Sequence, residues 1–150
     1  MTLYRQLLAR ENENNPIRVG VIGAGQMGFG MISQIAAIPG MSIVGISDIH
    51  VEAAQKAADA YNATATKKEK ILLSNDFKEI IHSDLVEVIV DATGVPEVGA
   101  KISLETLLAK KQLVLLNVEI DITIGPLIEK TNMTALVSYI LALMATNRLR

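Results

Sequence analysis

Three glycines near the N-terminus have the spacing that most clearly predicts chemistry. They belong to the stretch Gly23-Ala24-Gly25-Gln26-Met27-Gly28, which has the form Gly-x-Gly-x-x-Gly. In a dinucleotide site the first glycine forms a tight turn, the second lets the backbone approach the cofactor's pyrophosphate, and the third lets a helix lie close to a strand. The alternative is that the glycines only make a compact turn, as in some α/β proteins without a dinucleotide.

The flanking segments decide between these interpretations, because the motif is specific only when a strand precedes it and a helix follows it. Residues 17–22 are a short apolar run with β-branched side chains, typical of a parallel strand covered on both faces. Apolar residues recur at helical spacing from 26 to 38, and Pro39 and Gly40 then end the helix. The sequence therefore favours a dinucleotide site in which the motif residues and the N-terminus of the helix bind the cofactor.

Asp48 ends the next predicted strand, residues 42–47, about 20 residues after the last glycine of the motif. A carboxylate at this position is expected to accept hydrogen bonds from the adenosine ribose hydroxyls and to disfavour a 2′-phosphate. The cofactor is expected to be NAD or NADP, and NAD is slightly favoured because no Arg follows Asp48. His50 keeps NADP open, since a protonated imidazole could face a 2′-phosphate, but a solvated loop residue is the favoured interpretation.

A third apolar strand, residues 85–90, leads into a second group of candidate site residues. Ala92, Thr93 and Gly94 follow its end, where small residues and backbone groups can line the cofactor. Asp91 precedes them and either belongs to the site or caps the turn, and the two interpretations do not exclude each other.

A further strand is predicted at residues 112–116. Asn117 and Glu119 come directly after it and are expected to contact the cofactor or the substrate, whereas Asp121 is better interpreted as the cap of the next helix. His82 is expected to be a surface residue away from the site.

Helical segments separate the predicted strands. Helices are expected at residues 51–61, 77–81 and 96–108, with a short edge strand at 71–73. Strands that alternate with helices at this spacing predict right-handed crossovers and ligands at the carboxyl ends of the strands. The expected fold is therefore α/β, a Rossmann fold with a doubly wound, mostly parallel sheet in a single domain.

Composition excludes several other classes of protein. The 150 residues are 50% apolar, which is sufficient for a buried core, and the formal net charge is −2 without a basic block, so no nucleic-acid partner is expected. There is no Cys, no secretory signal at the N-terminus and no apolar stretch of the roughly 20 residues that span a bilayer, so a cytoplasmic protein without membrane contact is expected. The two histidines have no ligand-spaced partners, so no metal site is expected.

The motifs together resemble one family. Residues 16–28, 91–94 and 117–121 are similar to the predicted homoserine dehydrogenases, and more closely to the branch with a C-terminal SAF domain, the 1-deoxy-D-xylulose 5-phosphate reductoisomerase-like oxidoreductases. The resemblance covers roughly residues 3–132. True homoserine dehydrogenases carry an Asn-Lys pair where this chain has Val118 and Glu119, which argues against homoserine as the substrate.

This resemblance implies the N-terminal cofactor domain of a longer oxidoreductase, which exchanges hydride between nicotinamide and a small carbonyl or alcohol. Three segments are expected in the chain: a helical arm and linker at 1–15, an NAD(P)-binding domain at 16–133, and an atypical apolar tail at 134–150. The domain would then be truncated, lacking the part that supplies most of the substrate pocket. The alternative is a non-catalytic nucleotide-binding remnant, and self-association into a homo-oligomer is expected as a further possibility.

The apolar tail departs from the family's continuation, which carries the motifs AGVVYT and GDEPA. Permissible codons for residues 135–150, read in a shifted frame, yield both motifs. We therefore hypothesise a frameshift near Thr134, which the nucleotide sequence of the gene can test: nucleotides incompatible with the shifted reading would exclude it.

Overall fold

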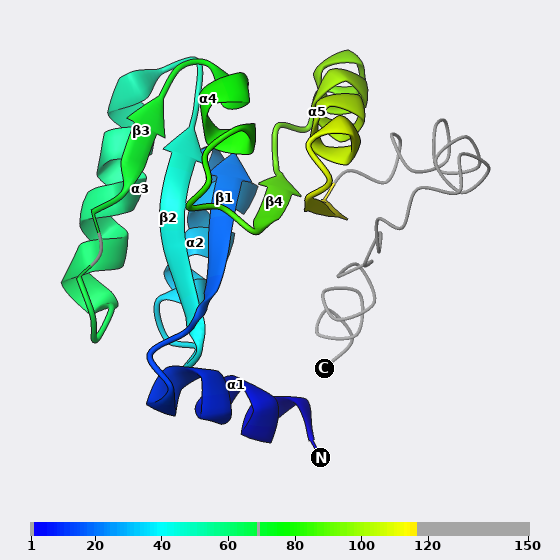
Figure 1. Cartoon of the computed structure of the whole chain (residues 1–150). Helices are drawn as coiled ribbons and strands as arrows, with labels where there is room; N and C mark the ends of the chain where they lie inside the picture. Colours follow the sequence, from blue (N-terminus) through cyan, green and yellow to red (C-terminus); the bar gives the residue numbers. More distant parts are fainter. Residues whose placement is uncertain (1, 69, 117–150) are drawn as a thin grey trace, which may run out of the picture.

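The computed structural model describes residues 2–68 and 70–116, which form a five-stranded sheet with helices on both faces (Figure 1). The strand order is β3-β2-β1-β4-β5, and each neighbouring pair is parallel. The strands are β1 Ile17–Ile22, β2 Met41–Ser47, β3 Leu72–Ser74, β4 Val88–Asp91 and β5 Gln112–Leu115. The chain order reverses direction across the sheet between β1 and β4, so the carboxyl ends of these two strands flank the crevice in which such sheets bind ligands.

Helices connect the strands and divide the core into two layers. The helices are α1 Leu3–Asn12, α2 Gln26–Ile35, α3 Val51–Thr64, α4 Phe77–Ile81 and α5 Pro96–Leu108. The first core layer packs α2 and α3 against one face of the sheet, with Val19 and Val21 of β1 at its centre. The second layer packs α4 and α5 against the other face, through residues such as Ile80 and Ile102. Both faces of the parallel sheet are therefore covered, as its apolar strands require.

Strand β1 shows how the sequence assigns side chains to the two layers. Val19 and Val21 are 1% and 0% exposed and face α2 and α3. Gly20, between them, faces the other layer, where an added Cβ would lie 2.7 Å from Cγ2 of Ile80. Gly20 therefore allows α4 to pack closely against the centre of the sheet.

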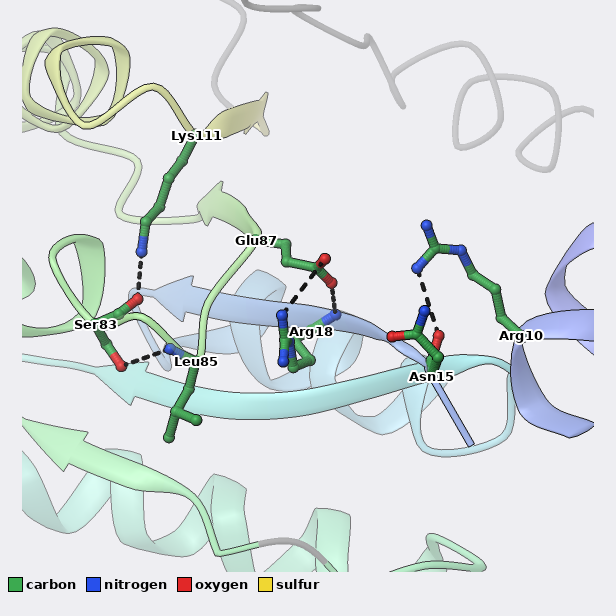
Figure 2. A network of polar contacts seen from close by, with 7 residues as sticks. All are labelled: Arg10, Asn15, Arg18, Ser83, Leu85, Glu87 and Lys111. Carbon is green, nitrogen blue, oxygen red and sulfur yellow. Dashed lines mark hydrogen bonds and ion pairs between the residues drawn. The ribbon is translucent and has the colours of Figure 1, made fainter. Parts of the chain in front are cut away.

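Polar contacts fix the opposite, amino-terminal ends of the strands (Figure 2). Glu87 accepts a hydrogen bond from the backbone N–H of Arg18 at 3.1 Å, and its other carboxylate oxygen lies 3.5 Å from Nη2 of Arg18. The Lys111 ammonium donates to the carbonyl oxygen of Ser83. These contacts join β1 to the residue before β4, and the residue before β5 to the turn after α4.

The predicted fold is confirmed, while several element boundaries differ. Leu85, which the sequence assigns to a strand, precedes β4 in a turn and is 55% exposed, so the apolar run alone placed the strand start three residues too early. Asp91 is the last residue of β4, one residue beyond the predicted end of that strand, and α1 extends to Asn12 within the predicted arm and linker. The expected segment boundary at residue 134 lies outside the described residues.

Helix α1 lies across the amino-terminal end of the sheet, below the strands in Figure 1. It has no buried residue and contacts the domain through polar groups. Glu11 accepts from the backbone N–H of Gly40 at 2.9 Å and pairs with Lys67 at 3.2 Å. The Gly40 hydrogen bond and the Lys67 contact lower the pKa of Glu11, which stays ionised as the carboxylate partner of both groups. Within the described part of the chain, no helix is both long and apolar enough to cross a bilayer.

Candidate functional site

The turn between β1 and α2 places the three motif glycines in different surroundings. Gly23 has a φ of +96°, and an added Cβ would lie 2.8 Å from the carbonyl carbon and oxygen of Ala92. At Gly28 an added Cβ would lie only 1.8 Å from the carbonyl oxygen of Gly23. These two glycines are therefore required by the close approach of backbone segments within the fold.

Gly25 is different, because an added Cβ would meet no atom within 4 Å. It is the N-cap residue of α2 and supplies no capping side chain, and Gln26 and Met27 beside it are exposed. The first amides of a helix have no partner within the helix, and together with the helix dipole they favour an anion. The glycine turn is thus open at the position where a diphosphate would approach it.

Asp48 lies at the carboxyl end of β2 beside this turn. Its Oδ2 accepts a hydrogen bond from the backbone N–H of Ala24 at 2.7 Å, and its Oδ1 accepts from the backbone N–H of His50 at 2.8 Å. The carboxylate is half-buried, and each oxygen keeps lone pairs for a further donor. The sequence predicted the place of Asp48 but not its bond to Ala24, since the two residues are far apart in sequence and meet only when β1 and β2 pair.

The loop after β4 forms the other side of the turn. Asp91 Oδ1 accepts from both the backbone N–H and the hydroxyl of Thr93, at 3.0 and 2.7 Å. The Thr93 hydroxyl in turn accepts from the backbone N–H of Val95 at 3.5 Å. Because its proton is committed to Asp91, the Thr93 hydroxyl is left as an acceptor toward any ligand. Gly94 is exposed and has a φ of +66°, which favours glycine there.

The Asp91 side chain lies in the core. The residue is 0% exposed, and its Oδ2 has no hydrogen-bond partner among the described residues. Burial raises the pKa of the Asp91 carboxyl, and the hydrogen bonds from the Thr93 N–H and hydroxyl oppose this without cancelling it. Of the two interpretations that the sequence left open for Asp91, the structure places it in the cap of the turn, behind the loop residues 92–94.

The remaining predicted residues are divided. Asn117 and Glu119 lie outside the described residues, as does Asp121. His50 is an exposed N-cap of α3, at the same strand end as Asp48. His82 is exposed, and its Nε2 lies 2.7 Å from Oε1 of Glu105 on α5. Its prediction as a surface residue away from the site is confirmed.

A cavity of about 130 Å³ lies at the opposite end of the sheet, away from the glycine turn. Its walls include Glu11, Tyr61 and Lys67, and the Tyr61 hydroxyl accepts from the backbone N–H of Ile43 there. The glycine turn is an open edge and not an enclosed cavity. The candidate site is therefore located by the glycine motif and the carboxylates, and not by a cavity. No group of His, Asp and Glu suited to a metal ion occurs in the residues that the structure describes.

Strand order, glycine turn and strand-end carboxylate together define an NAD(P)-binding Rossmann domain. Residues 17–140 match the family model described as dihydrodipicolinate reductase, N-terminus. The chain belongs to this family.

Similar curated proteins share shorter segments. A glycosyl hydrolase family 109 protein of Streptomyces coelicolor is 46% identical over 43 residues, which are 29% of this chain and 9% of that protein. An alpha-N-acetylgalactosaminidase of Shewanella oneidensis is 25% identical over 79 residues, covering 51% of this chain and 17% of that protein. The chain therefore matches a small part of each relative.

Solved structures agree with the fold. A myo-inositol dehydrogenase of Lactobacillus casei, in complex with NAD(H) and myo-inositol, superimposes with a TM-score of 0.66 at 21% identity, covering 83% of this chain and 36% of that one. A probable dehydrogenase of Thermotoga maritima gives a TM-score of 0.64 at 17% identity, covering 81% and 35%. The chain spans about a third of the length of these proteins.

Proposed function

We propose that this chain is the cofactor domain of an oxidoreductase, in which nicotinamide exchanges hydride with a small carbonyl or alcohol substrate. The observation that carries the proposal is the open space at Gly25. A Cβ there would meet nothing from the protein, whereas the flanking glycines are closed in by backbone. A diphosphate at this position would receive the free amides at the start of α2.

In this proposal different residues bind different parts of the cofactor. The glycine turn would hold the pyrophosphate, Asp48 the adenosine ribose, and Ala92, Thr93 and Gly94 the nicotinamide half, with Asn117 and Glu119 as further contacts predicted by sequence. The cofactor supplies the hydride chemistry, and the protein orients it. NAD is the preferred cofactor in this proposal, because a 2′-phosphate would lie against the Asp48 carboxylate.

The resemblance to one particular branch of a family, given in the sequence analysis, is also a proposal. Similarity to the SAF-domain branch of the predicted homoserine dehydrogenases is supported by the motifs at residues 16–28 and 91–94. Homoserine itself is disfavoured as the substrate by Val118 and Glu119. A homo-oligomer and a cytoplasmic location stay predictions.

Calorimetric titration of the full chain with NADH and NADPH tests the proposal. We expect saturable binding that is tighter for NADH, and a weakening of at least about tenfold in Gly25→Val, whose side chain would fill the diphosphate position. Because nothing in the protein surrounds that Cβ, the variant should unfold at the same temperature as the wild type. Equal affinity of wild type and Gly25→Val for NADH would exclude the glycine turn as the site. In a second assay, turnover of an alcohol or aldehyde would distinguish an enzyme from a remnant that only binds the cofactor.

A further inference from the structure

Two consecutive amides tie the glycine turn to the end of β2. The N–H of Gly23 donates to the carbonyl oxygen of Ser47 at 2.8 Å, and the N–H of Ala24 donates to Oδ2 of Asp48 at 2.7 Å. The first bond joins backbone to backbone, so any residue at position 47 can make it. The second bond depends on one side chain, which fixes the plane of the peptide between Gly23 and Ala24.

The Asp48 carboxylate is itself held in place. Its other oxygen accepts from the N–H of His50 at 2.8 Å, and the backbone N–H of Asp48 donates to the carbonyl oxygen of Ser74 at 3.2 Å. Hydrogen bonds to an ionised group are about twice as strong as those between neutral groups. Because the Asp48 carboxylate is fixed by these bonds, it can restrict the movement of the glycine turn.

The turn is also closed from the other side, where Ala92 leaves no room for a side chain at Gly23. Between these two contacts lies the short path from Gly23 to Gly25 and the start of α2. Movement of the Gly23–Ala24 peptide would shift the amides that follow it, and an anion site of backbone amides loses strength when its donors are misaligned.

We infer that Asp48 is a positioning residue that braces the glycine turn, and that it supports diphosphate binding independently of any contact with the ribose. This inference rests on the proposed function of the turn. It separates two roles of one carboxylate: accepting ribose hydroxyls, and holding the Ala24 amide.

Two ligands separate the roles. ADP carries the diphosphate and both ribose hydroxyls, whereas 2′,3′-dideoxyadenosine 5′-diphosphate carries the diphosphate but neither ribose hydroxyl. Their dissociation constants would be measured by NMR titration of the full chain as wild type, Asp48→Ala and Asp48→Asn. Both variants remove the charge, and only Asn keeps an oxygen that can accept from Ala24.

We expect Asp48→Ala to bind the dideoxy ligand roughly three- to tenfold more weakly than Asp48→Asn does, because the two variants differ by one neutral hydrogen bond to the Ala24 amide. The exchange rate of the Ala24 amide hydrogen should rise at least about tenfold in ligand-free Asp48→Ala and less in Asp48→Asn. Asp76→Ala is the matched control, because it also removes a carboxylate that accepts from a backbone N–H, at Lys78 in the cap of α4. It should leave the binding of both ligands unchanged.

Equal affinity of Asp48→Ala and Asp48→Asn for the dideoxy ligand, with ADP alone weakened relative to wild type, would overturn the brace and leave the proposed function intact. An unchanged exchange rate at Ala24 would overturn it as well. Failure of the wild type to bind either ligand would overturn the proposed function, and the brace with it.

Discussion

The glycine turn after β1 and the loop after β4 each depend on a carboxylate at the end of a strand, but the two carboxylates have different surroundings. Asp48 is half-buried, and its two oxygens each accept from one backbone amide. Asp91 is fully buried, and both of its donors come from Thr93 to the same oxygen. Asp48 can therefore serve the open edge of the site, whereas Asp91 holds a loop from within the core at a cost in desolvation.

The tightest contact on the glycine side gives the largest expected effect. Gly28→Ala would place a Cβ against the carbonyl oxygen of Gly23, so α2 has to move away from β1. We expect a loss of about 3 kcal/mol or more in the free energy of unfolding, at the upper end of the cost of overpacking. Urea denaturation followed by circular dichroism measures it.

Gly30→Ala is the matched control, since it lies in the same helix and its Cβ would meet nothing within 4 Å. Alanine is the better helix former, so this variant should gain about 0.5–1 kcal/mol. Similar stabilities for the two variants would contradict the close approach of α2 to the turn.

The burial of Asp91 predicts a dependence on pH. Because burial raises its pKa in the folded protein above the value near 3.9 of an unfolded chain, the unfolded state ionises first as the pH rises. The free energy of unfolding from this group therefore falls from about pH 4 up through the folded-state pKa. Asp91→Asn cannot ionise and keeps an acceptor for Thr93, so it should become more stable relative to wild type as the pH rises from about 4 to 7.

The stability of Asp91→Asn relative to wild type should fall as the pH approaches 4, where the wild-type carboxyl is also neutral. Denaturation curves at both pH values measure this difference. Asp59→Asn, on the exposed face of α3, makes the same change in net charge and controls for it. A difference in stability between Asp91→Asn and wild type that stays the same at both pH values would contradict the raised pKa of Asp91.

The smallest effect on the free energy of unfolding is expected for substitutions of Thr93, in the loop after β4. Thr93→Val keeps the shape of the side chain but removes the hydroxyl that donates to Asp91 and accepts from Val95, for a loss of about 1 kcal/mol. Thr93→Ser should retain most of that contribution. A double-mutant cycle with Asp91→Ala, which removes the acceptor of both bonds from Thr93, should show coupling between the two residues, and additive effects would mean that the hydroxyl acts elsewhere.

Much of the fold was predictable because its signals are local. The apolar strand at residues 17–22, the glycines and the periodic helix that ends before Pro39 lie in one stretch, so their order in the sequence already specifies strand, turn and helix. The start of β4 was predicted wrongly for the same reason. Leu85 is of a residue type that is common in strands. It lies in a turn because the pairing of β4 with β1 begins only at Val88.

The sequence alone determined which residues stand at the carboxyl ends of the strands, and with them the dinucleotide-binding class, because strand ends follow from local apolar patterns. Only the tertiary structure decided what those residues contact. Asp48 reaches Ala24, and Gly23 lies against Ala92, through the pairing of β1 with β2 and β4, so residues distant in sequence share one edge. The burial of Asp91 likewise depends on the packing of α5 against the sheet, which no local pattern specifies.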